Sequence, residues 1–394
     1  MAHLHDTAGT EPKQDAAAGR GARVRESCLR YLDEGMTVIT YSVRRKFSTK
    51  PNWPVTARLT REQAERLNDR DADKKNVGIL TGMPSGGLFD VDLDVPQAVA
   101  AAKVFLPPTD RMHGRPSNPR SHYWFRSPDT PDHETFAWQF ADDGKQTKYV
   151  ELRGGNDASA SQTMIPPSRH PNGEELIWDA DGEPATLPYA ELHRCGVQVA
   201  LAALFARHWP AEGARNDGAL ALSGGLVRET DWNDEEVDAF VTTVAHIAGD
   251  EEYAQRANAE RTRQRLHEEQ PTTGWTKLAE LLPTGERVVA KAREWLETIA
   301  TTPDHPGAEA GTTADETDTR TGKDGHSRRP SPADDAEREL AGVLAALLGP
   351  RSRTHQQSGD ARGNTTGEAH ADESAPASGL HCLEPCTELF HTQD

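Results

Sequence analysis

One apolar β-type run carries three aspartates at alternate positions. In GLFDVDLDVP (87–96), Asp90, Asp92 and Asp94 are separated by single apolar residues. Alternate side chains of a strand share one face and lie about 7 Å apart, so the three carboxylates would line one face. Such a row repels itself unless a cation neutralises it, and Mg²⁺ or Mn²⁺ would suit the oxygen ligands. The run therefore predicts either a metal-binding strand or a solvated edge strand whose acids deter aggregation.

The turn before this run favours the first interpretation. TGMPSGG (81–87) contains three glycines. Glycine lets the backbone pass close to a ligand or to another chain segment. We therefore expect the acidic face to lie in a binding site.

Several further segments resemble strands, and short helical patterns separate them. A first helix is expected over Arg25–Glu34, with Cys28, Leu29 and Leu32 on one face, and shorter helices over 61–68 and 96–105. The strand-like runs are MTVITYSV (36–43), NVGILTG (76–82), SHYWFR (121–126), KYVELRG (148–154) and QTMIPPS (162–168). Without regular βαβ spacing, this order predicts an α+β domain over residues 23–185.

The composition changes after Trp178. Apolar residues at helical spacing predict an all-helical domain over residues 186–300, with helices near 188–208, 216–228, 233–248, 250–268 and 284–300, and with Asp234 as a helix cap. Residues 1–22 are expected to form a disordered arm, and residues 301–394 a mostly disordered acidic tail with one amphipathic helix at 333–349. The hydrophobic fraction of 35% and the mean hydropathy of -0.75 fit disordered flanks.

The net charge of -19 is unevenly distributed. Residues 1–170 hold 24 lysines and arginines against 22 acids, whereas residues 171–394 hold 20 against 41. The near-neutral first part is therefore the part that is compatible with a nucleic-acid partner. No membrane span or secretory signal is recognisable, so a cytoplasmic location is expected. Four cysteines do not make a disulfide framework, and His381, Cys382 and Cys386 fall short of a zinc ligand set.

Three other short motifs carry candidate functional residues. SHYWFR places His122 on a sheet face, and Arg115 and Arg120 precede it with the right chemistry for phosphate oxygens. The imidazole could equally be a buried structural group. KYVELRGG puts Glu151 and Arg153 on one face, where they could simply pair with each other. In QTMIPPSRHPNG, Ser168, Arg169 and His170 follow two prolines on a polar loop.

The order of these motifs resembles the bifunctional primase-polymerase (prim-pol) domain of the archaeo-eukaryotic primase superfamily, over about residues 25–180. FDVDLD, SHYWF and YVELRGG stand where that family has a DxD strand, an SxH strand and a strand with a third acid. The resemblance implies an RRM-like primase-polymerase sheet domain. It also implies metal binding by Asp90, Asp92 and Glu151, with Asp94 as an alternative that shifts the pair to Asp92 and Asp94.

The resemblance further implies contacts of His122 with the nucleotide, and Ser121, Arg120 and Arg153 are candidates to join it. The implied function is template-directed nucleotidyl transfer on single-stranded DNA with nucleoside triphosphates, by a two-metal mechanism with Mg²⁺ or Mn²⁺. The helical part looks like the segment after prim-pol domains in phage and mobile-element replication proteins. No GxxxxGK[ST] motif is present, so a helicase would be a separate partner. The alternatives are a metal-dependent nuclease and a non-catalytic nucleic-acid-binding replication module, the latter with aromatic side chains exposed on its sheet.

Overall fold

A computed structural model describes residues 19–128, 135–142 and 144–301. Its strands are β1 (Val38–Ser42), β2 (Lys75–Leu80), β3 (Leu88–Leu93), β4 (Arg111–Arg115), β5 (Asn118–Arg126), β6 (Phe136–Asp142), β7 (Lys145–Arg153), β8 (Gln162–Ile165), β9 (Ile177–Asp181) and β10 (Ala185–Thr186). Its helices are α1 (Arg20–Asp33), α2 (Trp53–Thr56), α3 (Arg61–Glu65), α4 (Asp69–Ala72), α5 (Pro96–Phe105), α6 (Tyr189–Arg207), α7 (Arg215–Glu229), α8 (Asp234–Ile247), α9 (Ala259–His267), α10 (Trp275–Leu281) and α11 (Gly285–Thr301), with short 3-10 turns η1 (Met83–Ser85) and η2 (Tyr253–Gln255).

The strands form two sheets, and the acidic run is central in the larger one. Its order is β6-β7-β3-β5-β4-β9, and β10 adds to β5 in parallel. Neighbouring strands in the order β6-β7-β3-β5-β4-β9 pair antiparallel. A three-stranded sheet has the order β1-β2-β8. The expected α+β class is confirmed, and all six predicted strands are present as β1, β2, β3, β5, β7 and β8.

Strand periodicity divides the large sheet into an apolar and a polar face. Phe89, Val91 and Leu93 of β3 are buried in one core cluster together with Tyr123 and Phe125 of β5. The aspartates and His122 alternate with them and therefore face the other side. Because the aromatic residues of β5 are buried, the sheet does not offer the stacking surface that a purely nucleic-acid-binding module would need.

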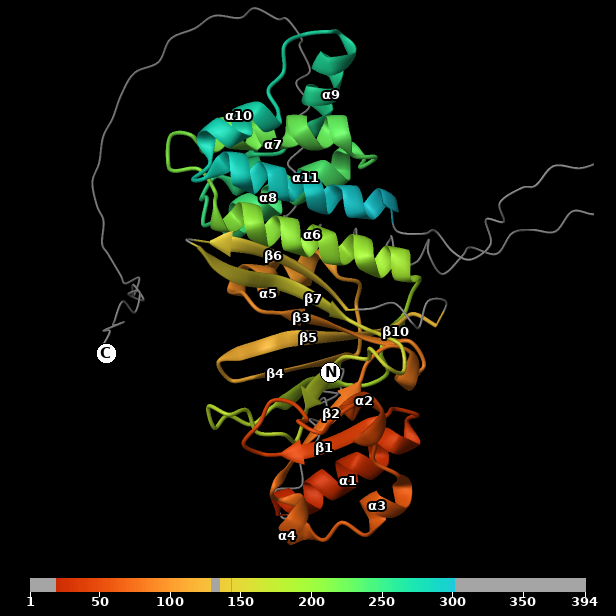
Figure 1. The fold of residues 1–394 in the computed structure, drawn as a ribbon. Coiled ribbons are helices and arrows are strands. Elements are labelled where there is room, and N and C mark those ends of the chain that lie inside the picture. The colour runs from red at the N-terminus through yellow and green to blue at the C-terminus, as the bar shows by residue number, and fades with distance from the viewer. Residues whose placement is uncertain (1–18, 129–134, 143, 302–394) are drawn as a thin grey trace, which may run out of the picture. The chain divides into compact units, whose positions relative to one another are not determined.

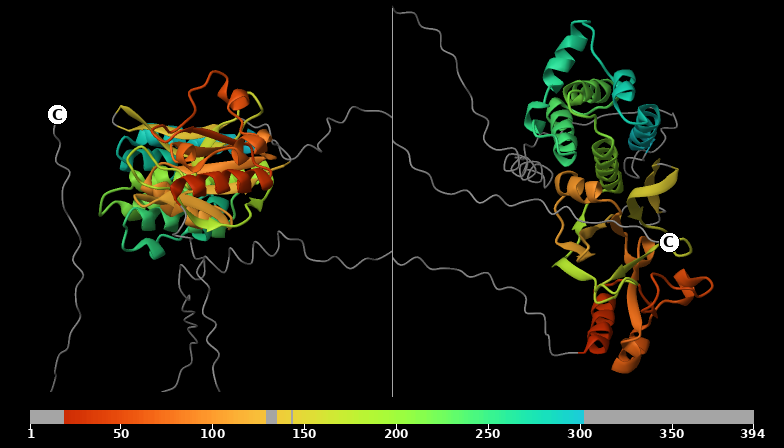
Figure 2. Two further views of the ribbon diagram at one scale, coloured as in Figure 1. Left: turned by 90° about the horizontal axis from the view of Figure 1, so that it is seen from below. Right: turned by 90° about the vertical axis from the view of Figure 1, so that its left-hand side faces the viewer.

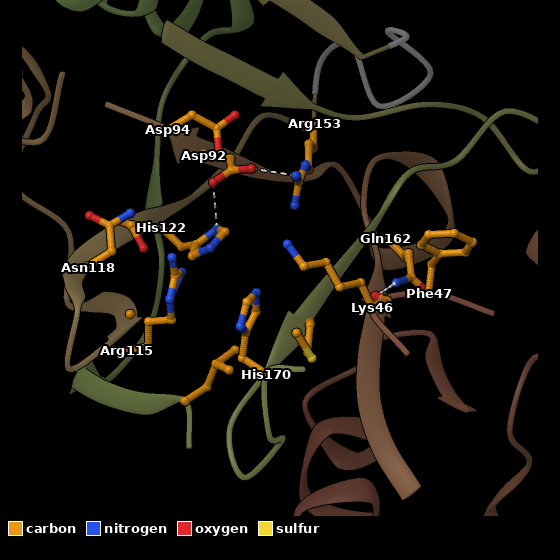
Figure 3. A pocket seen from close by; sticks show the side chains of 14 residues that line it. Lys46, Phe47, Asp92, Asp94, Arg115, Asn118, His122, Arg153, Gln162 and His170 are labelled. Atoms are coloured by element: carbon orange, nitrogen blue, oxygen red, sulfur yellow. Dashed lines mark hydrogen bonds and ion pairs between the residues drawn. The ribbon is translucent and has the colours of Figure 1, made fainter. Parts of the chain in front are cut away.

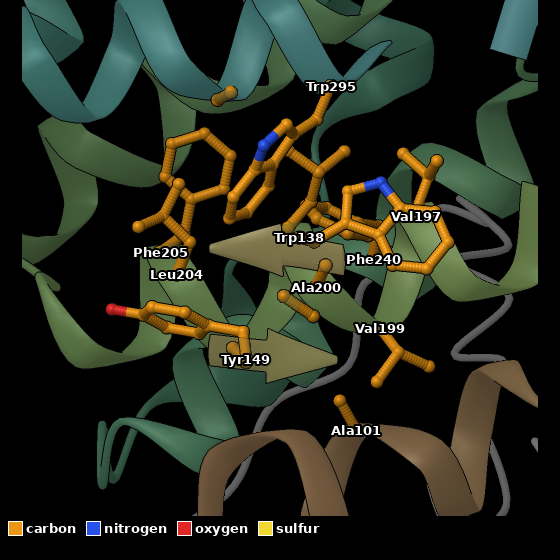
Figure 4. Close-up of a cluster of buried hydrophobic side chains, with 14 of the residues drawn as sticks. Ala101, Trp138, Tyr149, Val197, Val199, Ala200, Leu204, Phe205, Phe240 and Trp295 are labelled. Atoms are coloured by element: carbon orange, nitrogen blue, oxygen red, sulfur yellow. The ribbon is translucent and has the colours of Figure 1, made fainter. Parts of the chain in front are cut away.

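The apolar face of the sheet is covered by the helices that follow it in sequence. Helix α6 packs on α5 and β7, and α11 packs on α6 (Figure 1). Trp138 and Tyr149 from the sheet share their core with Phe205 of α6, Phe240 of α8 and Trp295 of α11 (Figure 4). The helices of residues 189–301 and helix α1 lie on opposite sides of the strands (Figure 2). The packing is thus continuous across residue 185, where we expected a domain boundary.

The polar face of the large sheet lies toward the smaller sheet. Trp124 and Leu88 share a core cluster with Val77 and Ile79 of β2 and with Val24 of α1. Between these apolar contacts, Thr163 of β8 reaches the acidic strand, where its hydroxyl donates to Asp90 at 2.6 Å. The second sheet therefore forms one wall of the space in front of the aspartates.

Several boundaries differ from the expectations for physical reasons. Helix α1 begins at Arg20, inside the expected disordered arm, because the Arg20 guanidinium binds the carbonyl oxygens of Asp73 and Lys75. Asn233, not Asp234, caps α8 in a capping box with Glu236. The helix expected over 250–268 is split into η2 and α9. Residues 1–18, the tail 302–394 and its cysteines lie outside the described residues. No helix among the described residues is both long and apolar enough to cross a membrane.

Candidate active site

The register of three neighbouring strands brings the motif residues together. Asp92 of β3 lies directly opposite His122 of β5 on one side and Glu151 of β7 on the other. Asp90 lies opposite Arg153 in the same way. Residues that are directly opposite in an antiparallel pair have Cβ atoms about 5 Å apart. Segments about 60 residues apart in the chain therefore meet at one place.

Arg153 lies at the centre of the carboxylates. Its guanidinium contacts Asp92, its Nη1 is 3.6 Å from Asp90 Oδ2, and its Nε donates to Glu151 Oε2 at 2.9 Å. Burial opposes the charge of Arg153, but the three carboxylates outweigh burial and raise its pKa. The pKa of Glu151 is lowered although burial acts against this, because Arg153 and Lys148 favour its charged form. The expected pairing of Glu151 with Arg153 is present, as part of a larger network.

The three aspartates of the acidic run have different surroundings. Asp90 is fully buried and accepts hydrogen bonds from Thr163 at 2.6 Å and His122 at 3.1 Å. Asp92 and Asp94 line a cavity, and Asp94 is exposed at its edge. Partial desolvation and then the negative charge of Asp92 raise the pKa of Asp94 to about 6. The pair that faces the cavity is therefore Asp92 and Asp94.

His122 is held between the aspartates and a second histidine. Its Nδ1 is 3.1 Å from Asp90 Oδ2 and 3.5 Å from Asp92 Oδ1. Burial lowers the pKa of His122, but the two carboxylates outweigh burial, and the net shift is upward. The ring stacks on His113 with centroids 4.3 Å apart and an interplanar angle of 6°. Because Nδ1 faces the carboxylates, the protonated ring can present its Nε2–H to the cavity.

His113 is a neutral support for His122 that sequence reasoning missed. Trp124 Nε1 donates to His113 Nδ1 at 3.0 Å, so the ring proton lies on Nε2, which is 3.0 Å from the carbonyl oxygen of Met164. Complete burial, followed by the proximity of His122, holds the pKa of His113 well below its usual range. The sequence showed only a histidine in an unremarkable segment.

The cavity in front of the aspartates has a volume of about 340 Å³ and a mixed lining (Figure 3). Strands of the large sheet supply Asp92, Gly114, Arg115, Asn118, Ser121, His122 and Arg153, and Asp94 directly follows β3. Gln162 and Met164 come from β8 of the smaller sheet, and Lys46, Phe47, His170 and Leu176 come from loops. Figure 3 shows the side chain of Lys46 pointing into this space. An acidic wall thus faces a set of cationic and hydrogen-bonding side chains.

The cationic side of the cavity differs from the one we expected. Arg120 is absent from the lining; it is exposed, has a positive φ of 50° and lies 3.7 Å from Asp179. Arg115 is present, with its Nε 3.1 Å from Glu174 Oε2. Lys46 was not predicted, although the run RRK at 44–46 was the available signal. Ser121 lines the cavity but is almost fully buried.

His170 is the residue of the PPSRH segment that reaches the cavity. Asn172 N–H donates to His170 Nδ1 at 3.3 Å, which leaves the proton of the neutral ring on Nε2. Partial burial lowers the pKa of His170, so it is mainly neutral and can donate from Nε2. Ser168 has a structural role, because its hydroxyl accepts a hydrogen bond from Val77 N–H at 2.8 Å and donates one to the Val77 carbonyl oxygen at 3.0 Å.

The glycine turn before β3 has a structural explanation. Gly82 has a φ of 78°, and a Cβ there would lie 2.1 Å from the carbonyl oxygen of Gly155. Residues 81–87 do not line the cavity. The glycine permits a close contact between two backbones, rather than an approach to a ligand.

The carboxylate oxygens of the site are suitable ligands for a hard divalent cation, but those of Asp92 and Glu151 are paired with Arg153. Asp92, Asp94 and Glu151 offer the carboxylate oxygens that Mg²⁺ and Mn²⁺ prefer. Their crowding is shown by Asp94, whose charged form is disfavoured by both Asp92 and Glu151. In the described part of the chain, no three His, Cys, Asp or Glu side chains are arranged as a metal site. Arg153 now supplies the compensating positive charge.

The comparisons with known proteins agree with this arrangement. No curated protein matches the chain. Residues 28–190 match the Prim-Pol family model, described as bifunctional DNA primase/polymerase, N-terminal. The matched region runs from α1 to the start of α6 and contains every residue that lines the cavity. Residues 28–190 therefore form a Prim-Pol domain, the N-terminal domain of bifunctional DNA primases/polymerases.

Proposed function

We propose that the cavity catalyses template-directed nucleotidyl transfer on single-stranded DNA, with Mg²⁺ or Mn²⁺ as cofactor. The observation that carries this proposal is the cavity that is lined by Asp92 and Asp94 on one side and by Lys46, Arg115 and His170 on the other. A nucleoside triphosphate with its metal ions presents complementary charges to both sides. The volume of about 340 Å³ lies at the lower end of the range for small-molecule sites.

The basic side would hold the triphosphate. Lys46 is exposed and supplies a flexible point charge, whereas Glu174 orients the Arg115 guanidinium. His122 would donate from Nε2, and its raised pKa favours the cationic form, which binds phosphate more strongly. These groups act by positioning and charge stabilisation, which are the main protein contributions to phosphoryl transfer.

The acidic side would hold the metal ions. We assign Asp92, Asp94 and Glu151 as ligands, and Asp90 as the buried support of His122 and Arg153. When bound, the cations would activate the attacking 3′-hydroxyl and neutralise the triphosphate. Arg153 would lose carboxylate partners on metal binding, and its position in the cavity lining suits it to contact a phosphate oxygen instead.

The chain would meet its partners in a replication setting. Single-stranded DNA is the template and nucleoside triphosphates are the substrates. A replicative helicase, as in phage or mobile-element systems, would provide the unwinding. All residues that we assign to the catalytic centre lie within the Prim-Pol match.

Extension of a primed template by the full chain tests this assignment. We expect Asp92→Asn to lower kcat by about 100-fold or more, because a metal ligand is lost. Asp110→Asn is the matched control, since Asp110 is an exposed aspartate outside the cavity, and it should retain wild-type activity. Equal activity of Asp92→Asn and wild type would overturn the assignment. Degradation of the DNA without nucleotide incorporation would indicate a nuclease instead.

A further inference from the structure

A basic loop follows β1 and borders the cavity. We use the name basic loop for residues 43–52. Its backbone is anchored at three points: Asn76 Nδ2 lies 3.4 Å from Val43 O and 3.3 Å from Arg45 O, and Gln162 Nε2 donates to Lys46 O at 2.7 Å. The loop is therefore tied to β2 and β8 beside the cavity.

An aromatic side chain is exposed on this anchored backbone. Phe47 exposes 57% of its surface and is the largest side chain among the exposed large hydrophobic residues of the described chain. It also lines the cavity, at the edge where Gln162 lies (Figure 3). The next residue, Ser48, is buried and fixes the backbone at this point. Phe47 thus presents an open ring face where a ligand in the cavity would emerge.

Cations without acidic partners flank Phe47 in the sequence. Arg44, Arg45, Lys46 and Lys50 are all exposed, and within the described residues none of them has an ion pair. No acid occurs between Glu34 and Glu62 in the sequence. By contrast, Arg58 and Arg61, which follow the loop in sequence, pair with Asp157 and Asp33. The basic loop therefore carries uncompensated positive charge on both sides of Phe47.

We propose that the basic loop binds the single-stranded nucleic acid that enters the cavity, with one base stacked on Phe47 and the backbone phosphates along Arg44, Arg45 and Lys50. This combination of an exposed aromatic ring and a cationic path is the arrangement by which proteins bind single strands without sequence preference. An acidic peptide would use the cations but not the ring. The proposal rests on the proposed function, because it assigns a surface to the template strand.

Binding of a fluorescently labelled single-stranded oligonucleotide by the full chain tests this proposal. The measurement is made by anisotropy in EDTA, without nucleotides, so that binding is separated from catalysis. We expect Phe47→Ala to weaken binding by about 5- to 150-fold and Phe47→Trp to restore it, because stacking on one aromatic ring is lost and regained. Val55→Ala is the matched control: Val55 is also exposed, in the segment just after the loop, and should bind as wild type.

The salt dependence of binding tests the role of the cations. For a single strand, the slope of the logarithm of the binding constant against the logarithm of the salt concentration becomes less steep by about 0.7 for each phosphate contact that is removed. Arg44→Ser/Arg45→Ser should therefore reduce the slope by about 1.4. Arg66→Ser/Arg70→Ser removes two exposed arginines of the same domain and should leave the slope unchanged.

The outcomes separate this proposal from the function that it rests on. If the chain binds the oligonucleotide but Phe47→Ala binds equally well, the loop assignment is wrong and the proposed function stands. If Phe47→Ala changes only the KM for nucleotide, the ring stacks on the incoming base, which also overturns the assignment. An acidic polypeptide that displaces the oligonucleotide equally from wild type and Phe47→Ala would contradict it as well. Asp92→Asn should bind the oligonucleotide as wild type does.

Discussion

Amide substitutions along β3 separate a buried support from a cavity ligand. Asp90 is fully buried and is bonded to Thr163 and His122, with Arg153 Nη1 3.6 Å away. Asp90→Asn removes the charge that balances these groups. Loss of one partner from a buried ion pair costs roughly 3–5 kcal/mol. Because Arg153 keeps its contacts with Asp92 and Glu151, we expect the lower end of this range, a loss of about 3 kcal/mol in the free energy of unfolding.

Asp94→Asn should preserve the stability of the fold but lower the activity. Asp94 is exposed at the edge of the cavity, and its charged form is disfavoured by partial desolvation and by Asp92, so loss of its charge relieves repulsion. We expect the free energy of unfolding of Asp94→Asn to change by less than about 1 kcal/mol, or to rise, as for other exposed charges. Primer extension should nevertheless fall strongly, because a proposed metal ligand is lost.

Urea unfolding, primer extension and Mn²⁺ binding by calorimetry, all at about pH 8, provide the comparison. This pH is well above the pKa of about 6 of Asp94, so its carboxylate is charged. We expect weakened Mn²⁺ binding in Asp94→Asn with intact stability. If Asp94→Asn binds Mn²⁺ and extends primers normally, while Asp90→Asn is stable but inactive, the metal ligands are Asp90 and Asp92 and our assignment of Asp94 is wrong.

Three further predictions follow from the network, the cavity and the shared core. The pKa of His113 in the folded state lies below the ordinary value of 6.5, so the unfolded chain takes up the proton first and the folded state loses stability as the pH falls below 6.5. In urea unfolding between about pH 7.5 and 5.5, His113→Gln should lose less free energy of unfolding than wild type, and equal slopes of this free energy against pH would contradict the prediction. Lys46→Ala should raise the nucleotide KM about tenfold in steady-state kinetics, because a charged contact to the triphosphate is lost. Arg120→Ala, outside the cavity, should leave the KM unchanged, and equal effects of the two variants would count against the assigned basic side. Ending the chain after residue 185 uncovers the sheet face beneath α6, so the fragment should lose cooperative unfolding and activity together. A well-folded, active fragment would show that the helices are dispensable.

The sequence alone predicted the strands of the site well, for a local reason. In β3, β5 and β7 the alternation of polar and apolar residues is itself the two-residue period of the strand. The faces of Asp92, His122, Glu151 and Arg153 could therefore be assigned before the register was known. Their order along the chain then indicated the family, and the family match confirms it.

The remaining parts of the site depend on tertiary contacts that leave little local signal. Lys46 and His170 reach the cavity because β1 and β8 both pair with β2, which places their loops beside β3. Arg120 is one residue from a cavity residue, but its positive φ turns it toward Asp179. The expected helix over 250–268 is interrupted at Asp250 and Arg256, which are buried and pair with each other at 2.8 Å.

Primer synthesis by the full chain on unprimed single-stranded DNA is the decisive test of nucleotidyl transfer at this cavity. The assay contains labelled nucleoside triphosphates with Mg²⁺ or Mn²⁺, and Asp92→Asn and Asp110→Asn are run beside wild type. We predict labelled products of increasing length from wild type and Asp110→Asn, and none from Asp92→Asn. Products of equal yield from Asp92→Asn, or an absence of products from wild type with either metal, would contradict it.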